Sequence, residues 1–122
     1  MTKQEIFERV YIHLMRQGCK SVIQTPRGID YPVYYGEYGL KCAIGCLIPQ
    51  EEYQRDWERH PLERVLARCS TFRGIDDAHG LLFMLRACHD TLKPSCWKTR
   101  LAWIAKKQGL VVTEALQQLD VR

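Results

Sequence analysis

Residues Tyr34 to Tyr53 decide the fold, and they read YYGEYGLKCAIGCLIPQEEY. The residue pattern changes every few positions, so one amphipathic helix cannot run through the whole stretch. Val33-Tyr34-Tyr35 is typical of a strand, Gly36-Glu37-Tyr38-Gly39 of a reversal, and Leu40-Lys41-Cys42 of a return strand. We therefore predict a small β-hairpin here. A short buried helix over Ala43–Ile48 is expected to follow, and Pro49 suits the first turn of another helix through Tyr53.

Helices are expected on both sides of this hairpin, because an isolated hairpin is only marginally stable in water. The first is indicated by the capping box Thr2-Lys3-Gln4-Glu5, with Gly18 as a natural stop. Further helices are predicted from Pro61 to Cys69, from about Asp76 to just before Pro94, from a Ser95 cap to Gly109, and after a Thr113 cap. Pro26-Arg27-Gly28 is expected to be a turn. The sequence thus predicts a mainly α (α+β) fold, a compact helical domain of about five helices with a small β-hairpin.

The whole chain has 122 residues and no repeat or linker, so we expect a single globular domain over residues 1–122. Its hydrophobic content of 46% and charged content of 26% are typical of a soluble protein. No apolar run approaches the length of a membrane span, and Glu5 and Glu8 interrupt the apolar pattern of the N-terminus, so neither a membrane partner nor a secretory signal is expected. We therefore expect a cytoplasmic protein with six reduced cysteines, most of them in the core.

A thiol site is the first candidate for chemistry. Cys42 precedes a predicted helix, whose free amides and dipole would stabilise a thiolate and lower the pKa of the thiol. A cysteine nucleophile also needs a base with an orienting acceptor, and His89-Asp90 is the one adjacent His-Asp pair in the chain. Neighbouring side chains on a helix diverge, however, which argues against Asp90 orienting His89. The alternative, which we favour, is that Cys42 and His89 are packed core residues.

A metal or a nucleotide cofactor is not expected. Cys42 and Cys46 have a spacing that zinc permits, with Cys88, His89 or Cys96 to complete the ligands, but Cys46 lies inside an apolar run where a buried thiol is expected anyway. Gly36, Gly39 and Gly45 do not form a phosphate-binding loop, because neither GxxxxGK[ST] nor a strand–loop–helix frame is present.

A basic surface is the second candidate. No acidic residue occurs between Thr91 and Thr113, and five cations do. On the predicted helix, Trp103 has Arg100, Lys106 and Lys107 as neighbours, away from the stripe that Trp97 and Leu101 share. An exposed aromatic among cations suits nucleic acid or an acidic protein surface. The alternative is that Leu110 to Val121 folds back over Trp103 and buries it.

Tyrosines make the hairpin a second part of that binding surface. Tyr34, Tyr35 and Tyr38 can bury large area at a low cost in side-chain entropy, so they suit a protein interface. Their alternative role is cross-strand packing within the hairpin. Trp57 is a further exposed candidate, but its charged neighbours are of both signs and favour no particular partner.

Three segments together carry a resemblance to a family: EIFERVYIHLMRQG, the central stretch quoted above, and LLFMLRACHDTLKPSCWKTRLAWIAKKQGL. They resemble small uncharacterised phage and bacterial proteins in which a Tyr-Arg-Gly turn leads into Cys-Ala-Val-Gly-x-Leu-Ile-Pro, with a His-Asp pair and a Trp further on. Tyr35 stands where that family often has Arg, and Ile44 where it has Val. The matching positions are Cys42, Ala43, Gly45, Leu47, Ile48, Pro49, His89, Asp90 and Trp97.

The resemblance implies a phage-like setting and a shared fold, without a mechanism, and small phage proteins of this kind often bind host factors. Together with the surface candidates it favours a phage-type interaction protein that binds and modulates a host protein, such as a defence or regulatory factor, in the host cytoplasm. Two alternatives stay open: a Cys-His thiol enzyme, and a protein that binds nucleic acid through the basic C-terminal helix.

Overall fold

The computed structural model describes every residue from Met1 to Arg122. It confirms a mainly α fold with a small antiparallel hairpin. The five α-helices and two strands are α1 Lys3–Gln17, β1 Val22–Gln24, β2 Asp30–Pro32, α2 Leu62–Arg68, α3 His79–Thr91, α4 Pro94–Gln108 and α5 Glu114–Gln117. Short 3₁₀ turns fill much of the remainder: η1 Glu37–Gly39, η2 Gly45–Leu47, η3 Arg55–Arg59, η4 Ser70–Phe72 and η5 Asp76–Ala78.

Helix α1 begins and ends where its capping residues predict. The Thr2 hydroxyl accepts from the Glu5 N–H at 3.1 Å, and the Glu5 carboxylate accepts from the Thr2 N–H at 3.0 Å. This reciprocal pair satisfies amides that have no partner within the helix. At the other end, Gly18 takes a left-handed conformation with φ of 68°, which glycine adopts at little cost.

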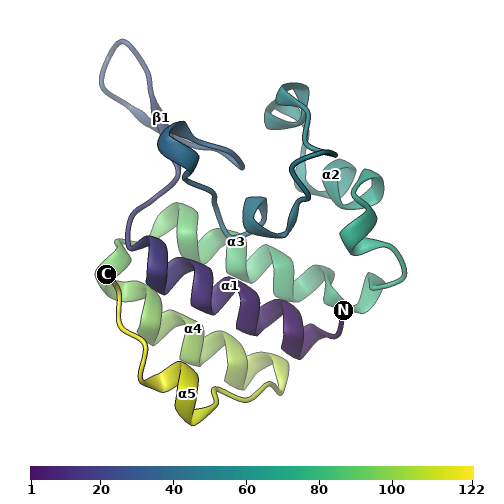
Figure 1. The fold of residues 1–122 in the computed structure, drawn as a ribbon, viewed down its shortest axis with the longest axis vertical. Helices are drawn as coiled ribbons and strands as arrows, with labels where there is room; N and C mark the ends of the chain where they lie inside the picture. Colours follow the sequence, from purple (N-terminus) through teal and green to yellow (C-terminus); the bar gives the residue numbers. More distant parts are fainter.

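Three long helices form the base of the molecule. In Figure 1, α1 lies in front of α3 and α4, which pack directly on each other, with α1 and α3 running in the same direction and α4 running back. The C-terminal segment returns along α1 after α5. Gln4 exchanges two hydrogen bonds with the backbone of Val111, and the Arg122 N–H donates to the Met15 carbonyl at 3.0 Å. Residues 21–75 cover the opposite side of α1.

The hairpin is formed by other residues than the predicted ones. The two strands pair around the Pro26–Gly28 turn, with Ile23 opposite Tyr31, and this ribbon projects from the helices (Figure 1). The expected strands meet in one bridge only, between Tyr35 and Lys41, on either side of η1. The physical reason is Glu58, whose carboxylate accepts from the Tyr34 and Tyr35 N–H groups at 2.9 and 3.1 Å and so occupies both donors.

Three smaller expectations also need correction. Pro49 to Tyr53 makes a single turn and no helix. The buried helix after Cys42 is only the 3₁₀ turn η2, Gly45–Leu47. Lys93 precedes α4 in place of the predicted Ser95 cap, and Pro94 occupies the first turn, where its missing N–H costs nothing. Thr113 does cap α5, accepting from the Leu116 N–H at 3.3 Å.

The core is one cluster of 28 buried residues, six of which come from the central stretch: Tyr34, Cys42, Ala43, Ile44, Leu47 and Ile48. Ala43 and Ile44 are fully buried against the helices, while Trp57, expected on the surface, is only 4% exposed. Gly45 packs so closely on the backbone that a Cβ atom there would lie 1.9 Å from the Tyr34 carbonyl oxygen. In contrast, β2 is exposed along its whole length.

None of the helices combines the length and the apolar character needed to cross a membrane.

Candidate functional site

Cys42 lies three residues before η2, since the helix expected from Ala43 does not form, and its chemistry is the opposite of the prediction. The Gly45 N–H donates to the Cys42 sulfur at 3.3 Å, which is the expected contact at the beginning of η2. The side chain is buried, however, with 3% of the residue exposed. Burial disfavours the charged thiolate, and it raises the pKa of Cys42 to about 12. The expected lowering of this pKa is therefore wrong, because desolvation outweighs the amide contacts.

His89 is fully buried and both of its ring nitrogens are engaged. The Ser21 N–H donates to Nε2 at 2.9 Å, which places the ring proton on Nδ1. Nδ1 in turn donates to the Asp90 carboxylate at 2.7 Å. Asp90 therefore does orient the ring of its neighbour His89, contrary to the expectation from helix geometry. Asp90 also contacts the Arg86 guanidinium at 3.4 Å, so its place near the C-terminal end of α3 has a local reason.

Because of these contacts, Cys42, His89 and Asp90 do not form the arrangement that a thiol nucleophile and its general base require. His89 has no free nitrogen with which to accept a proton from Cys42, and the Cys42 thiol stays protonated at neutral pH. The His89 ring, held by Asp90, instead accepts from the Ser21 N–H and so links the backbone at Ser21 to α3. A catalytic role for Cys42, His89 and Asp90 stays a prediction that the geometry does not support.

A small polar cavity of about 40 Å³ lies beside this cluster, and no sequence pattern indicates it. The Tyr34 hydroxyl and the His60 Nδ1 atom are buried without a hydrogen-bond partner. Burial raises the pKa of Tyr34 to about 12. The volume accommodates nothing much larger than water, so this cavity is too small for an organic substrate. Its lining includes Tyr34, Cys42, Glu58, His60, Arg86 and Asp90.

The three candidate tyrosines have three different environments. Tyr34 is buried, and Tyr35 stacks on Tyr53 with ring centroids 4.0 Å apart while its hydroxyl donates to the Ile48 carbonyl at 2.6 Å. Tyr38 is 95% exposed. Its backbone is also unusual, with φ of 59° at a residue other than glycine. Packing therefore accounts for Tyr34 and Tyr35, and only Tyr38 is available to a partner.

Trp103 is exposed, as its cationic neighbours indicated. It is 43% exposed, with the Arg100 guanidinium 4.9 Å and the Lys107 ammonium 5.5 Å from its ring. The alternative, that the C-terminal segment covers Trp103, is wrong. That segment packs on α1 through Val111 and Arg122 instead.

A groove beside Trp103 is the feature that sequence reasoning missed. It lies between α3 and α4, has a volume of about 240 Å³ and adjoins a wider hollow of about 570 Å³ along α4. Trp103 and Arg100 border both parts. The apolar side chains that line the groove are Met84, Ala87, Cys88, Leu92 and Ile104. Each is part of an ordinary amphipathic pattern, so only the packing of α3 against α4 reveals the groove.

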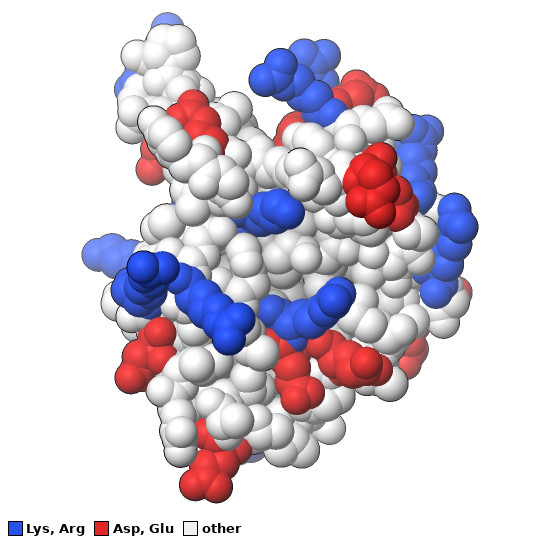
Figure 2. Space-filling model, viewed as in Figure 1, with Lys and Arg blue, Asp and Glu red and all other residues white.

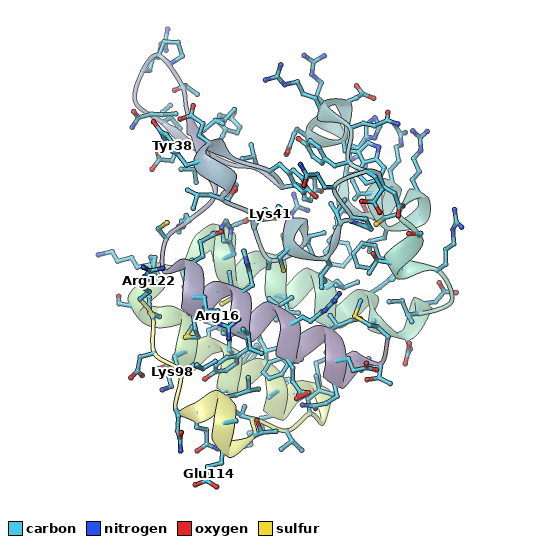
Figure 3. The ribbon with its side chains drawn as sticks, viewed as in Figure 1. Arg16, Tyr38, Lys41, Lys98, Glu114 and Arg122 are labelled. Atoms are coloured by element: carbon cyan, nitrogen blue, oxygen red, sulfur yellow. The ribbon has the colours of Figure 1, made fainter.

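The charge around the groove is positive and largely unpaired. Lys98 forms an ion pair with Asp120 at 2.8 Å, whereas Arg100, Lys106 and Lys107 contact no carboxylate. The Tyr38 loop is not part of this surface. It lies with the hairpin on one side of α1, and α4 lies on the other (Figures 1 and 3).

No set of three or more His, Cys, Asp and Glu side chains is placed to hold a metal ion. All six cysteines are free thiols, of which Cys19 and Cys96 are exposed. No protein-family model, curated protein or solved structure matches the chain. The resemblance to phage and bacterial proteins therefore rests on the sequence pattern alone, and a phage origin stays a prediction.

Proposed function

We propose that this protein works by binding another protein, and that the groove between α3 and α4 receives a segment with an apolar side chain flanked by carboxylates. The observation that carries the proposal is Trp103, which stands exposed at the edge of the groove between two cations. Tryptophan and arginine are the residues that most often dominate the binding energy of protein interfaces.

The chemistry of the groove supports an acidic partner with an apolar anchor. Six of its eight lining residues are hydrophobic, so an aliphatic or aromatic side chain would leave water on entering it. Arg100 and Lys107 border the ring of Trp103 and have no carboxylate of their own chain. Carboxylates on a partner would complement these charges and speed association.

Protein is favoured over nucleic acid by the shape and composition of the same groove. Proteins that hold single-stranded nucleic acid usually offer several aromatic rings along a basic channel, whereas Trp103 is the one aromatic residue bordering this groove. Nucleic-acid binding remains the alternative that the experiment below distinguishes. If the chain is phage-encoded, as its resemblance implies, the partner is a host protein in the cytoplasm.

The test uses Trp103 as its own reporter, because Trp57 and Trp97 are buried. The probe is a helical peptide with two leucines four residues apart and glutamates beside them. We expect it to shift the fluorescence of Trp103 to shorter wavelength in a saturable way. A second peptide with glutamine at each glutamate position is expected to bind at least about tenfold more weakly, because binding then loses the charge complementarity.

Three variants and one oligonucleotide complete the test. Trp103→Ala is expected to weaken peptide binding about thirtyfold, measured by calorimetry, as truncation of an interface tryptophan commonly does. Lys107→Glu should weaken it as well, whereas Arg64→Glu, an exposed site on α2, should not. Equal losses in the two charge variants would overturn the proposal. So would tighter, strongly salt-dependent binding of a thymidine 20-mer, which would indicate a nucleic-acid surface.

A further inference from the structure

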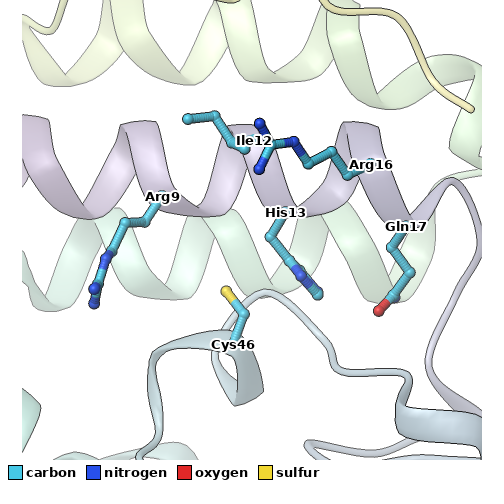
Figure 4. A pocket seen from close by; sticks show the side chains of 6 residues that line it. All are labelled: Arg9, Ile12, His13, Arg16, Gln17 and Cys46. Atoms are coloured by element: carbon cyan, nitrogen blue, oxygen red, sulfur yellow. The ribbon is translucent and has the colours of Figure 1, made fainter.

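A second cleft lies along α1, on a face that no part of the proposed function uses. Arg9, Ile12, His13, Arg16 and Gln17 share this face, since residues three and four apart are neighbours on a helix. The opposite wall is Cys46, in η2. The cleft between them has a volume of about 580 Å³, within the range of small-molecule sites. Figure 4 shows Arg9 toward one end and Gln17 toward the other, with the His13 ring between them beside Cys46 and the Arg16 guanidinium next to Ile12.

The two guanidinium groups of this cleft have no carboxylate partner. The four ion pairs of the molecule involve other cations, and the one side-chain hydrogen bond of Arg9 goes to the Met1 sulfur at 3.9 Å. One exposed arginine without a partner is ordinary. Here two of them lie two helical turns apart, about 10 Å along the axis, and line the same cleft.

The positive field extends over the floor of the cleft. Both Lys41 and Arg9 act on the Cys46 thiol by charge, although burial remains the dominant influence and raises the pKa of Cys46. Lys and Arg side chains gather across this face over α1 (Figure 2), where Figure 3 labels Arg16 and Lys41. Glu5 and Glu8 line an adjoining hollow that shares Arg9 and Ile12 with the cleft, and neither carboxylate forms an ion pair with Arg9.

One end of the cleft is held rigid by hydrogen bonds. The His13 Nε2–H donates to the Lys41 carbonyl at 2.7 Å. Gln17 donates to the same carbonyl at 2.8 Å and accepts from the Lys41 N–H at 2.9 Å. Both side chains therefore fix the 40–42 backbone against α1, so the shape of this end does not depend on a ligand. A preformed site costs less free energy to occupy than one that must be ordered.

We propose that this cleft binds a small phosphorylated anion, with Arg9 and Arg16 donating to phosphate oxygens and Lys41 adding charge at the rim. Guanidinium forks match phosphate geometry, and each can donate two parallel hydrogen bonds. A single carboxylate is matched by one guanidinium group. The two guanidinium groups and the Lys41 ammonium together match the higher negative charge of a phosphate monoester or a diphosphate. The anion would be held by side chains, consistent with the absence of a glycine-rich phosphate loop.

The test is a titration with inorganic pyrophosphate at constant ionic strength, followed by amide chemical shifts in ¹H–¹⁵N NMR spectra. We expect saturable shifts confined to residues 9–17 and 41–46. Arg9→Gln and Arg16→Gln should each weaken binding about tenfold or more, since each removes charge-assisted hydrogen bonds. Arg64→Gln, which removes an exposed arginine from α2, should leave the dissociation constant unchanged.

Two results would overturn the proposal. Shifts that do not saturate, or an Arg64→Gln variant weakened as much as Arg9→Gln, would mean that the anion only screens the cationic surface. A thymidine 20-mer that shifts the same amides at lower concentration than pyrophosphate would assign the cleft to a nucleic-acid backbone in place of a small ligand. Neither result bears on the α3–α4 groove, because Arg9 and Arg16 lie outside it.

Discussion

Two influences act in opposite directions on the Cys42 thiol. The Gly45 N–H at 3.3 Å favours the thiolate, whereas full burial favours the protonated form. Burial prevails because one amide contact cannot replace the water that a charged sulfur would lose. The position of a cysteine before a helix is therefore insufficient evidence of reactivity, and exposure decides the matter.

The reactivity of the cysteines follows the same rule. We expect Cys19 and Cys96, both exposed, to be alkylated by iodoacetamide at pH 8 within minutes, and Cys42 to react about a thousandfold more slowly because almost none of it is thiolate. Mass spectrometry of each cysteine-containing peptide over time gives the rates, with denatured protein as the control. Fast labelling of Cys42 in the native protein would instead restore the thiol enzyme.

Individual residues of the site could be predicted to different extents. The position of Trp103 away from the apolar stripe follows from its own helix, but its exposure also depends on the C-terminal segment, which packs on α1. The burial of Tyr34 and Trp57 depends on partners far along the chain, so local pattern could not reveal it. In the sequence, Arg9 and Arg16 are ordinary surface arginines of an amphipathic helix. Only the fold brings Cys46 opposite them.

At the level of elements, the displaced hairpin shows the limit of strand propensity. Val33 to Tyr35 has strand character, yet the Tyr34 and Tyr35 N–H groups donate to the Glu58 carboxylate of η3, and the Val33 N–H donates to the Ser21 carbonyl. The Pro26–Gly28 turn was predicted, but the flanking segments are too short and polar to indicate strands by alternation. Helix boundaries could be predicted more closely, because capping residues act within a few positions of the helix end that they define.

Gly45 is expected to control the contact between η2 and the segment around Tyr34. Gly45→Ala would force a Cβ atom to within 1.9 Å of the Tyr34 carbonyl oxygen unless the backbone moves. We expect a loss of about 3 kcal/mol in the free energy of unfolding, at the upper end of the usual cost of overpacking. Urea unfolding followed by circular dichroism measures it.

The matched control for this change is Gly80→Ala in the first turn of α3. The nearest atom to its added Cβ would be the Gln108 amide nitrogen at 3.8 Å, an ordinary contact. Alanine favours helix over glycine by up to about 1 kcal/mol, so this variant should be slightly more stable than the parent. If both variants unfold at the same urea concentration, the close approach at Gly45 does not constrain the fold.

Across the whole molecule, one core joins the central stretch to the three long helices, and its buried thiols make stability depend on pH. Burial raises the pKa values of Cys42 and Cys88 to about 12, and also that of Cys46. Above the unfolded value of about 9, the unfolded chain loses protons that the folded chain keeps. The free energy of unfolding therefore falls as pH rises from about 9 toward about 12.

The expected loss between pH 7.5 and 9.5 is on the order of 2 kcal/mol for the three thiols together. Urea unfolding at the two pH values, under reducing conditions, measures it. Cys88→Ala should reduce the loss by about a third, whereas Cys19→Ser, at an exposed position, should leave it unchanged. A stability that stays constant up to pH 9.5 would mean that these thiols are more hydrated than the structure indicates.

Tyr38 has a consequence for how this sequence has been selected. A left-handed backbone costs residues other than glycine and asparagine about 1–2 kcal/mol, and a ring that is 95% exposed recovers almost none of this by burial. Selection for folding alone would favour glycine or asparagine at this position. The η1 loop, closed by hydrogen bonds between the Gly36 N–H and the Leu40 carbonyl and between the Leu40 N–H and the Glu37 carbonyl, would keep its shape with either. The tyrosine is thus a residue that the fold tolerates without needing, and glycine or asparagine could replace it without loss of stability.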